Sequence, residues 1–187
     1  MTKALIVTAN GCEEIETIAT YDLLTRAGIV TTLAAVDESD VVVTAAHKLK
    51  FIANCTLSQK ITEDFDVIVL PGGLPGSEHL RDCSILIEML RRQKKAGRWI
   101  AAICAAPGYV LGTHNLVGNA KVTGYPGTES CFKTGTFVDQ KVCVDTEEHL
   151  ITAQGPAFTN AFALAVIANL CSVEVMRKVA DAALITA

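Results

Sequence analysis

Cys104 is the residue whose type and surroundings suggest the clearest chemistry. It follows an apolar run over residues 99–103 and precedes Ala105, Ala106 and Pro107. The run predicts a buried strand, and the proline suits the first turn of a helix. A sharp turn from strand to helix would raise the thiol above the edge of a sheet, as in a nucleophile elbow, and the positive helix end would lower its pKa. The alternative is a core cysteine packed as a small apolar residue, and this stretch alone does not separate the two.

Glu16 is a candidate partner for this thiol. Together with Glu13 and Glu14 it lies at the start of a helix predicted over residues 13–27. Two negative charges repel strongly in a sheltered site, so we expect Glu16 to stay protonated and to donate a hydrogen bond to the Cys104 sulfur. The alternative is that the three acids are only first-turn charges favoured by the helix dipole. We expect that alternative to hold for one or two of them.

Backbone amides are the second expected element of the site. Gly72 and Gly73 follow a predicted strand, and glycines allow the chain to approach another group closely. The N–H groups of Gly73 and Ala105 would then form an anion or oxyanion site, although a lone Gly-Gly pair can also mark only a tight turn. A Cys-His triad is not indicated, because no histidine adjoins Cys104 in the sequence. The four histidines fall in predicted loops or surface helices: His47, His79, His114 and His149.

The elements that must position these residues alternate between strand and helix. Strands are predicted over residues 3–9, 29–36, 41–45, 49–53, 66–70, 98–104, 121–124, 141–145 and 150–154, and helices over 13–27, 84–95, 157–170 and after Ser172. The two strands around His47 are expected to form a hairpin. This alternation predicts an α/β fold, with a mostly parallel sheet covered on both faces, in one domain over residues 1–187. Such folds bind ligands at the carboxyl ends of their strands, where the loops at 10–16, 71–76 and 104 onward would converge.

The composition narrows the class of protein. The 187 residues are 50% hydrophobic and 5% aromatic with a net charge of −4, and no basic run occurs. This argues against sequence-specific nucleic-acid binding and against an anionic membrane surface. The first apolar segment is too short to span a membrane and lacks the layout of a secretory signal. The 7 cysteines are odd in number and scattered, so we expect thiols in the reducing cytoplasm and no metal site.

Three motifs together resemble the ThiJ/PfpI superfamily, which is class I glutamine amidotransferase-like. They are Pro-Gly-Gly at residues 71–73, Ala-Ala-Ile-Cys-Ala-Ala-Pro at 101–107 and Glu-Glu-x-Glu-Thr at 13–17. The resemblance covers nearly the whole chain and is greatest for the branch of the parkinsonism-associated deglycase DJ-one and its bacterial relatives. It implies a flavodoxin-like three-layer α/β/α sandwich and a homodimer.

The resemblance also implies residue roles. Cys104 would be the reactive, oxidation-prone cysteine and Glu16 its protonated partner, with oxyanion donors around Gly72, Gly73 and Ala105. Arg26 matches an arginine that lies near the site across the dimer. Other residues that could contribute to a substrate or dimer site are His47, Tyr125 and Pro156. Tyr125 stands where relatives often carry histidine, and His47 replaces an arginine seen in some members.

The activity implied is that of a glyoxalase or deglycase that needs no cofactor. It would act through Cys104 on methylglyoxal or on early glycation adducts and would protect against carbonyl and oxidative stress. The alternative is a redox sensor or chaperone that works through oxidation of Cys104 to the sulfinate. Peptidase activity is not expected, because Ala105 stands where the protease-like branch has histidine. An amidotransferase-like hydrolase would need a histidine and a glutamate at triad spacing, and neither can be assigned.

Overall fold

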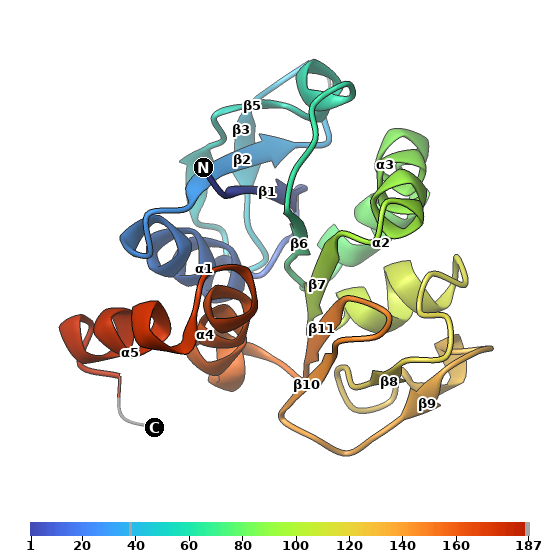
Figure 1. Ribbon diagram of the computed structural model, residues 1–187. Helices are drawn as coiled ribbons and strands as arrows, with labels where there is room; N and C mark the ends of the chain where they lie inside the picture. The colour runs from blue at the N-terminus through green and yellow to red at the C-terminus, as the bar shows by residue number, and fades with distance from the viewer. Residues whose placement is uncertain (38, 186–187) are drawn as a thin grey trace.

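A computed structural model describes residues 1–37 and 39–185 (Figure 1). Within that part of the chain, seven strands form one sheet in the order β10-β11-β7-β6-β1-β2-β5. All neighbours in it are parallel except β10 and β11. The strands of the sheet are β1 (Lys3–Thr8), β2 (Val30–Ala35), β5 (Cys55–Thr56), β6 (Val67–Leu70), β7 (Trp99–Ile103), β10 (Val142–Asp145) and β11 (Leu150–Ala153). The predicted mostly parallel α/β sheet is therefore confirmed.

The helices cover both faces of this sheet. They are α1 (Glu14–Arg26), α2 (Gly76–Asp82), α3 (Ser84–Lys95), α4 (Thr159–Leu170) and α5 (Val173–Ala182), with a π-helical segment η2 (Pro107–Gly112) and 3-10 turns η1 (Leu57–Lys60), η3 (Glu129–Cys131) and η4 (Pro156–Phe158). Helices α1 and α4 lie on one face, and α2, α3 and η2 lie on the other (Figure 1). The result is the three-layer sandwich that the sequence predicts.

Alternating side chains of β1 show how the two cores form. Ala4 and Ile6 belong to the cluster that includes Leu24 of α1 and Phe162 of α4. Leu5 and Val7, on the other face of β1, belong to the opposite cluster together with residues of α3. Because successive strand residues point to opposite faces, a fully apolar strand fills both cores at once.

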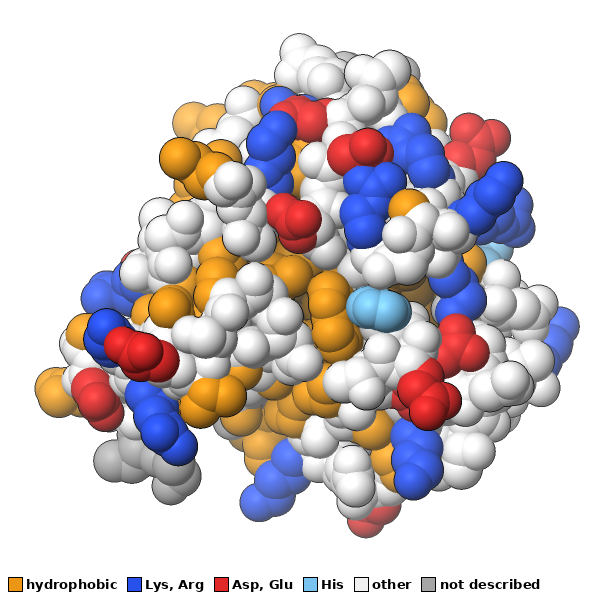
Figure 2. Space-filling model, in the orientation of Figure 1, with side chains coloured by type: hydrophobic (Ala, Val, Ile, Leu, Met, Phe, Trp, Pro, Cys, Tyr) orange, Lys and Arg blue, Asp and Glu red, His pale blue; other side chains and the backbone are white. Residues whose placement is uncertain are grey.

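Over residues 1–37 and 39–185, two small sheets lie outside the main one. Strands β3 (Val42–Thr44) and β4 (Lys50–Ile52) pair antiparallel, which confirms the predicted hairpin around His47. The strand predicted at 121–124 is shorter, β8 (Lys121–Val122), and it pairs with β9 (Thr136–Phe137). The sequence patterns do not predict β9. Acidic and basic side chains are interspersed around the rim of the face in Figure 2, with hydrophobic side chains gathered near its middle.

None of the helices over the described residues is both long enough and apolar enough to cross a membrane.

Candidate active site

Cys104 occupies a strained turn directly after β7. Its φ angle is +65°, in the left-handed region that a non-glycine residue rarely adopts. Its N–H donates to the Ala153 carbonyl at 2.9 Å, and its own carbonyl accepts from the Tyr125 N–H at 2.7 Å. Pro107 then begins η2, as the sequence predicts. The strand-to-helix elbow is therefore present, and strain of this kind is typical of functional positions.

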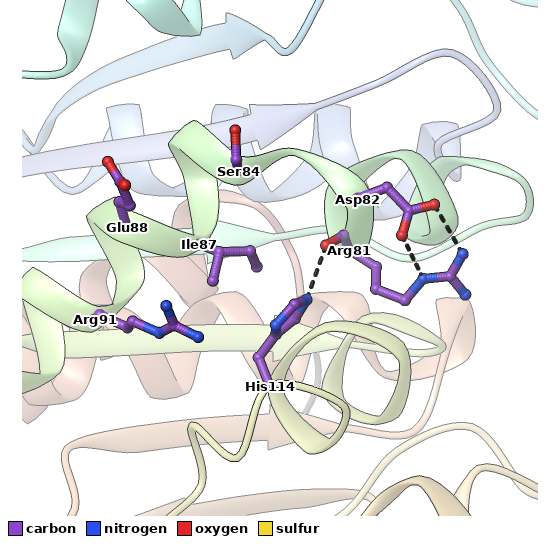
Figure 3. A pocket seen from close by; sticks show the side chains of 7 residues that line it. All are labelled: Arg81, Asp82, Ser84, Ile87, Glu88, Arg91 and His114. Carbon is purple, nitrogen blue, oxygen red and sulfur yellow. Dashed lines mark hydrogen bonds and ion pairs between the residues drawn. The ribbon is translucent and has the colours of Figure 1, made fainter.

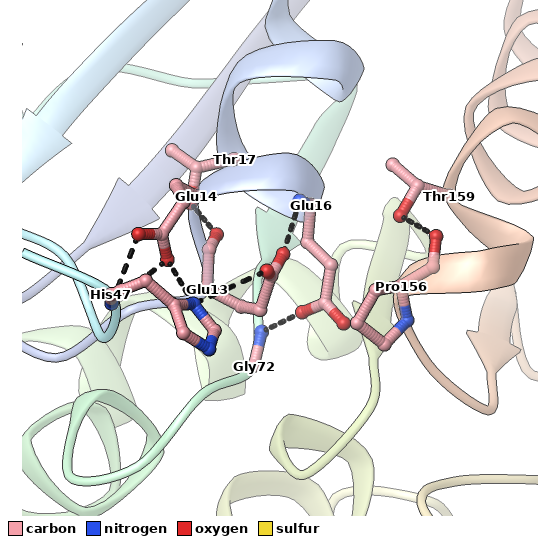
Figure 4. Close-up of polar contacts among 8 residues, drawn as sticks. All are labelled: Glu13, Glu14, Glu16, Thr17, His47, Gly72, Pro156 and Thr159. Atoms are coloured by element: carbon pink, nitrogen blue, oxygen red, sulfur yellow. Dashed lines mark hydrogen bonds and ion pairs between the residues drawn. The ribbon is translucent and has the colours of Figure 1, made fainter. Parts of the chain in front are cut away.

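Glu16 is the one of the three clustered acids that faces Cys104. Its side chain is buried, with the residue only 1% exposed. Its Oε2 accepts a hydrogen bond from the Gly72 N–H at 2.7 Å. Its carboxyl group also lies within hydrogen-bonding reach of the Cys104 thiol, and this interaction affects the pKa of both groups. In Figure 4 the carboxyl group points into the space between Gly72 and Pro156.

The other two acids have structural roles. Glu13 caps α1, because its Oε2 accepts from the Glu16 N–H at 2.8 Å. Glu14 binds the β3–β4 hairpin, because its carboxylate accepts from the His47 N–H at 2.9 Å and contacts His47 Nδ1 at 3.0 Å (Figure 4). Burial and these contacts have opposite effects on Glu14, and the net effect is a lowered pKa. Only Glu16 therefore remains for chemistry at the thiol.

The pKa values of Glu16 and Cys104 are both raised. Burial is the main cause for Glu16, with the charge of Glu13 also acting upward, and its pKa reaches about 7 although the Gly72 N–H lowers it. Burial and the charge of Glu16 raise the pKa of Cys104 to about 12. The lowered thiol pKa expected from a helix end is therefore wrong for this environment. The reason is that burial of the thiol and the charge of Glu16 outweigh the Gly73 and Ala105 amides, which lower the pKa.

Two backbone amides lie beside the sulfur. Hydrogen bonds from Gly73 and Ala105 lower the pKa of the Cys104 thiol and so act against the increase that burial causes. Gly73 has φ of +86°, and a Cβ at Gly72 would lie 2.6 Å from Cys104 Cβ and 2.9 Å from Glu16 Oε2. Both positions therefore require glycine, because the chain there lies too close to its neighbours for a side chain. The amides of Gly73 and Ala105 can stabilise a negative charge at or next to the sulfur.

His47 lies beside this arrangement, whereas Arg26 lies away from it. Three potential metal-ligand atoms, one each from Glu13, Glu14 and His47, lie within 4.8 Å of one another. This spacing could hold a cation. However, Glu13 already caps a helix, and Glu14 already bonds to the histidine. Arg26 is at the far end of α1, roughly 15 Å along the helix from Glu16, and pairs with Asp22 at 2.6 Å. Within one chain the structure does not bring Arg26 to Cys104.

Tyr125 and Pro156 line a pocket of about 200 Å³ next to the elbow. Phe158 completes this pocket, and the sequence analysis did not single it out. The feature of the sequence that could indicate Phe158 is its position shortly after β11, the strand next to β7.

Another hollow has neither Cys104 nor Glu16 in its lining. This hollow, of about 380 Å³, is lined by α2 and α3 residues together with His114 (Figure 3). There Arg81 pairs with Asp82 at 2.7 Å, and His114 Nε2 bonds to the Arg81 carbonyl at 2.9 Å. His79 Nδ1 bonds to the Asn10 carbonyl at 2.9 Å. These histidines have backbone partners, which agrees with a site that does not use a Cys-His pair.

The mostly parallel sheet places a cysteine on a strained strand-to-helix turn, where it faces a buried carboxyl group. These features define an α/β protein with a nucleophile-elbow cysteine. The chain belongs to the DJ-1/PfpI family, whose profile matches residues 2–169. The resemblance found in the sequence motifs is thereby confirmed.

Three known proteins illustrate the similarity. Protein DJ-1 homolog A of Arabidopsis thaliana is 41% identical over 168 residues, which are 89% of this chain but only 42% of that relative's length. A Caenorhabditis elegans protein named glutathione-independent glyoxalase DJR-1.2 is 30% identical over 167 residues, 89% of this chain and 87% of the relative. The structure of oxidised DJ-1 from Toxoplasma gondii matches with a TM-score of 0.94 at 35% identity and covers 98% of each chain.

Proposed function

We propose that this protein is a cysteine-dependent glyoxalase that needs no cofactor and acts on methylglyoxal or on early glycation adducts in the cytoplasm. The proposal rests on one observation, the Cys104 thiol placed between the Glu16 carboxyl group and the amides of Gly73 and Ala105. The name of the C. elegans relative supports the same reaction class. A role in protection against carbonyl and oxidative stress follows from removal of such reactive carbonyls.

The reaction begins with the proton that Glu16 and Cys104 share. Above pH 7 the pair holds one proton, and its transfer from sulfur to the carboxylate creates the thiolate next to a neutral acid. The thiolate adds to the aldehyde carbon, and the amides of Gly73 and Ala105 stabilise the resulting oxyanion. Protonation of that oxygen gives a hemithioacetal.

Glu16 then carries protons through the rearrangement. As a carboxylate it removes the hydrogen from the former aldehyde carbon, which gives an enediol, and returns a proton to the neighbouring carbon. The proton of the hemithioacetal hydroxyl moves to the oxygen of that neighbouring carbon, so that the first carbon becomes the thioester carbonyl and the second carries the hydroxyl group. The product is a thioester on Cys104. Water cleaves this thioester, so the net change is addition of one water to the 2-oxoaldehyde to give a 2-hydroxy acid and the original thiol.

The decisive experiment is methylglyoxal turnover without glutathione. The Cys104→Ala variant should lose at least about 100-fold in kcat/KM, because it lacks the nucleophile. Cys143→Ala is the matched control, since Cys143 is also a buried thiol but bonds to the Lys121 carbonyl away from the site. Turnover by Cys104→Ala at the parent rate would refute the proposal.

A second function, redox sensing or chaperone activity switched by Cys104, is favoured by the same two amides. They would stabilise the oxygens of a sulfinate, and the T. gondii structure is of an oxidised protein. Mass spectrometry after mild peroxide treatment should find sulfinate at Cys104 first. Earlier oxidation of the exposed Cys171 or of Cys55 would argue against a sensor at this position.

A homodimer is part of the proposal, and α1 provides the surface for it. Ile15 and Ile18 are 54% and 41% exposed, which is unusual for large apolar side chains on a helix of a sandwich. They share one helical stripe with Arg26, at spacings of three and eight residues. A second copy covering this stripe would bring Arg26 close to a subunit boundary.

A further inference from the structure

The pocket beside Cys104 has two walls built from separate segments. Tyr125 and Pro126 form one wall, and Pro156 and Phe158 form the other, around a volume of about 200 Å³. The walls are two aromatic rings and two prolines, so they offer mainly carbon to a ligand. Tyr125 is 52% exposed, which leaves the pocket open to solvent on one side.

Both walls are tied to the peptide groups of Cys104 itself. The Tyr125 N–H donates to the Cys104 carbonyl at 2.7 Å. The Cys104 N–H donates to the carbonyl of Ala153, which ends β11 just before the second wall. Figure 4 shows Pro156 also next to the Glu16 carboxyl group. The pocket walls are therefore fixed relative to the Cys104 backbone.

Several groups already lie around the Cys104 side chain. The Gly72 side is closed, since even a Cβ there would lie 2.6 Å from Cys104 Cβ. The amides of Gly73 and Ala105 receive the oxyanion, and Glu16 receives the proton. The walls of the carbon-lined pocket reach both the Cys104 peptide and the Glu16 carboxyl group, so this pocket lies beside the remaining substituent of a carbon bonded to the sulfur.

We infer that this pocket holds the substituent of the 2-oxoaldehyde and selects an aromatic group over methyl. The inference rests on the proposed glyoxalase function and names its substrate class. A methyl group leaves most of the volume unfilled, whereas a phenyl ring can contact the rings of Tyr125 and Phe158. Lys141 supports the second wall, with its Nζ 5.5 Å from the centre of the Phe158 ring.

The test compares kcat/KM for phenylglyoxal and methylglyoxal without glutathione. The parent protein should favour phenylglyoxal by about 10-fold or more, and Phe158→Ala or Tyr125→Ala should bring the ratio close to one. Tyr125→Phe keeps the ring and should retain the preference. Phe137→Ala is the matched control, because Phe137 packs against Phe132 elsewhere in the chain.

A second measurement does not require turnover. Mandelate, the product expected from phenylglyoxal, should protect Cys104 from iodoacetamide at roughly 10-fold lower concentration than lactate, and Phe158→Ala should abolish the difference. Equal protection by both acids, or equal kcat/KM for both aldehydes with turnover that still needs Cys104, would overturn the pocket assignment alone. Turnover that survives in Cys104→Ala would instead overturn the proposed function and this inference with it.

Discussion

Glu16 and Cys104 form a buried pair in which the carboxyl group, rather than the thiol, has the lower pKa. Burial raises the pKa of Glu16 to about 7, while burial and the Glu16 charge raise that of Cys104 to about 12. Between these values the pair holds one proton, and the reactive form is the one with that proton on Glu16. Loss of the first of the two protons, near pH 7, is thus the step that enables chemistry.

Alkylation of Cys104 should therefore rise with pH through about 7. Below that value both groups are protonated, and no thiolate forms. In Glu16→Gln the internal base is gone, so the inflection near pH 7 should disappear and reactivity should appear only at higher pH, where the thiol loses its proton to solvent. Rates of iodoacetamide labelling from pH 5 to 10, resolved by peptide mass spectrometry, measure this. An unchanged profile in Glu16→Gln would show that Glu16 does not control the thiol.

The same carboxyl group should make folding stability depend on pH. Its folded pKa of about 7 exceeds the ordinary 4.5, so the folded state binds its proton more tightly. This contribution is fully present below about pH 4.5 and is lost as pH rises to about 7, by on the order of 3 kcal/mol. Glu16→Gln should remove the loss and be the more stable protein at pH 8 in urea unfolding.

Glu14 provides a comparison of opposite sign. Its hydrogen bonds to His47 lower its pKa, so its contribution is present above its ordinary pKa and lost as pH falls. Glu14→Gln should therefore change stability on the acid side and leave the window between pH 4.5 and 7 as in the parent. If Glu16→Gln and the parent lose equal stability between those pH values, the buried carboxyl group is not the cause.

Gly72 should tolerate no side chain. In Gly72→Ala the new Cβ meets the Cys104 side chain and the Glu16 carboxylate, so we expect a loss of at least about 100-fold in kcat/KM and a destabilisation of about 1–3 kcal/mol. Gly97→Ala is the control, because Gly97 has φ of +63° but open space around its Cβ. The Gly97→Ala variant should lose about 1 kcal/mol of stability, and its Cys104 labelling should be unchanged. Equal losses of activity in both variants would mean that general destabilisation explains the effect.

The sequence predicts the sheet and the elbow well, because both depend on local pattern. Strands β6, β7 and β11 are almost continuously buried apolar runs, and small residues surround Cys104 where the chain turns. The sequence does not predict helix α2, because its residues Gly-Ser-Glu-His-Leu-Arg-Asp have no apolar periodicity and only its tertiary contacts bury Leu80.

The parts of the site that sequence reasoning could not supply depend on distance in space. The second pocket wall at Phe158 is fixed by the pairing of β11 with β7, which brings residue 153 to residue 104. The direction of the thiol pKa depends on how much water and charge surround the sulfur, and the sequence contains neither quantity. Glu16 could be predicted as the partner, because the loops after parallel strands converge at one edge.

The exposed stripe of α1 should control assembly and, through it, activity. Ile18→Lys places a charge in the proposed interface, so we expect the parent to sediment as a dimer and this variant as a monomer. Val144→Lys is the matched control, since Val144 is 40% exposed on β10, away from α1, compared with 41% for Ile18. Arg26→Ala should keep the dimer but lower kcat/KM if the guanidinium reaches the partner's site. A monomeric parent, or dissociation by Val144→Lys and not by Ile18→Lys, would remove α1 as the interface and leave Arg26 only as the surface partner of Asp22.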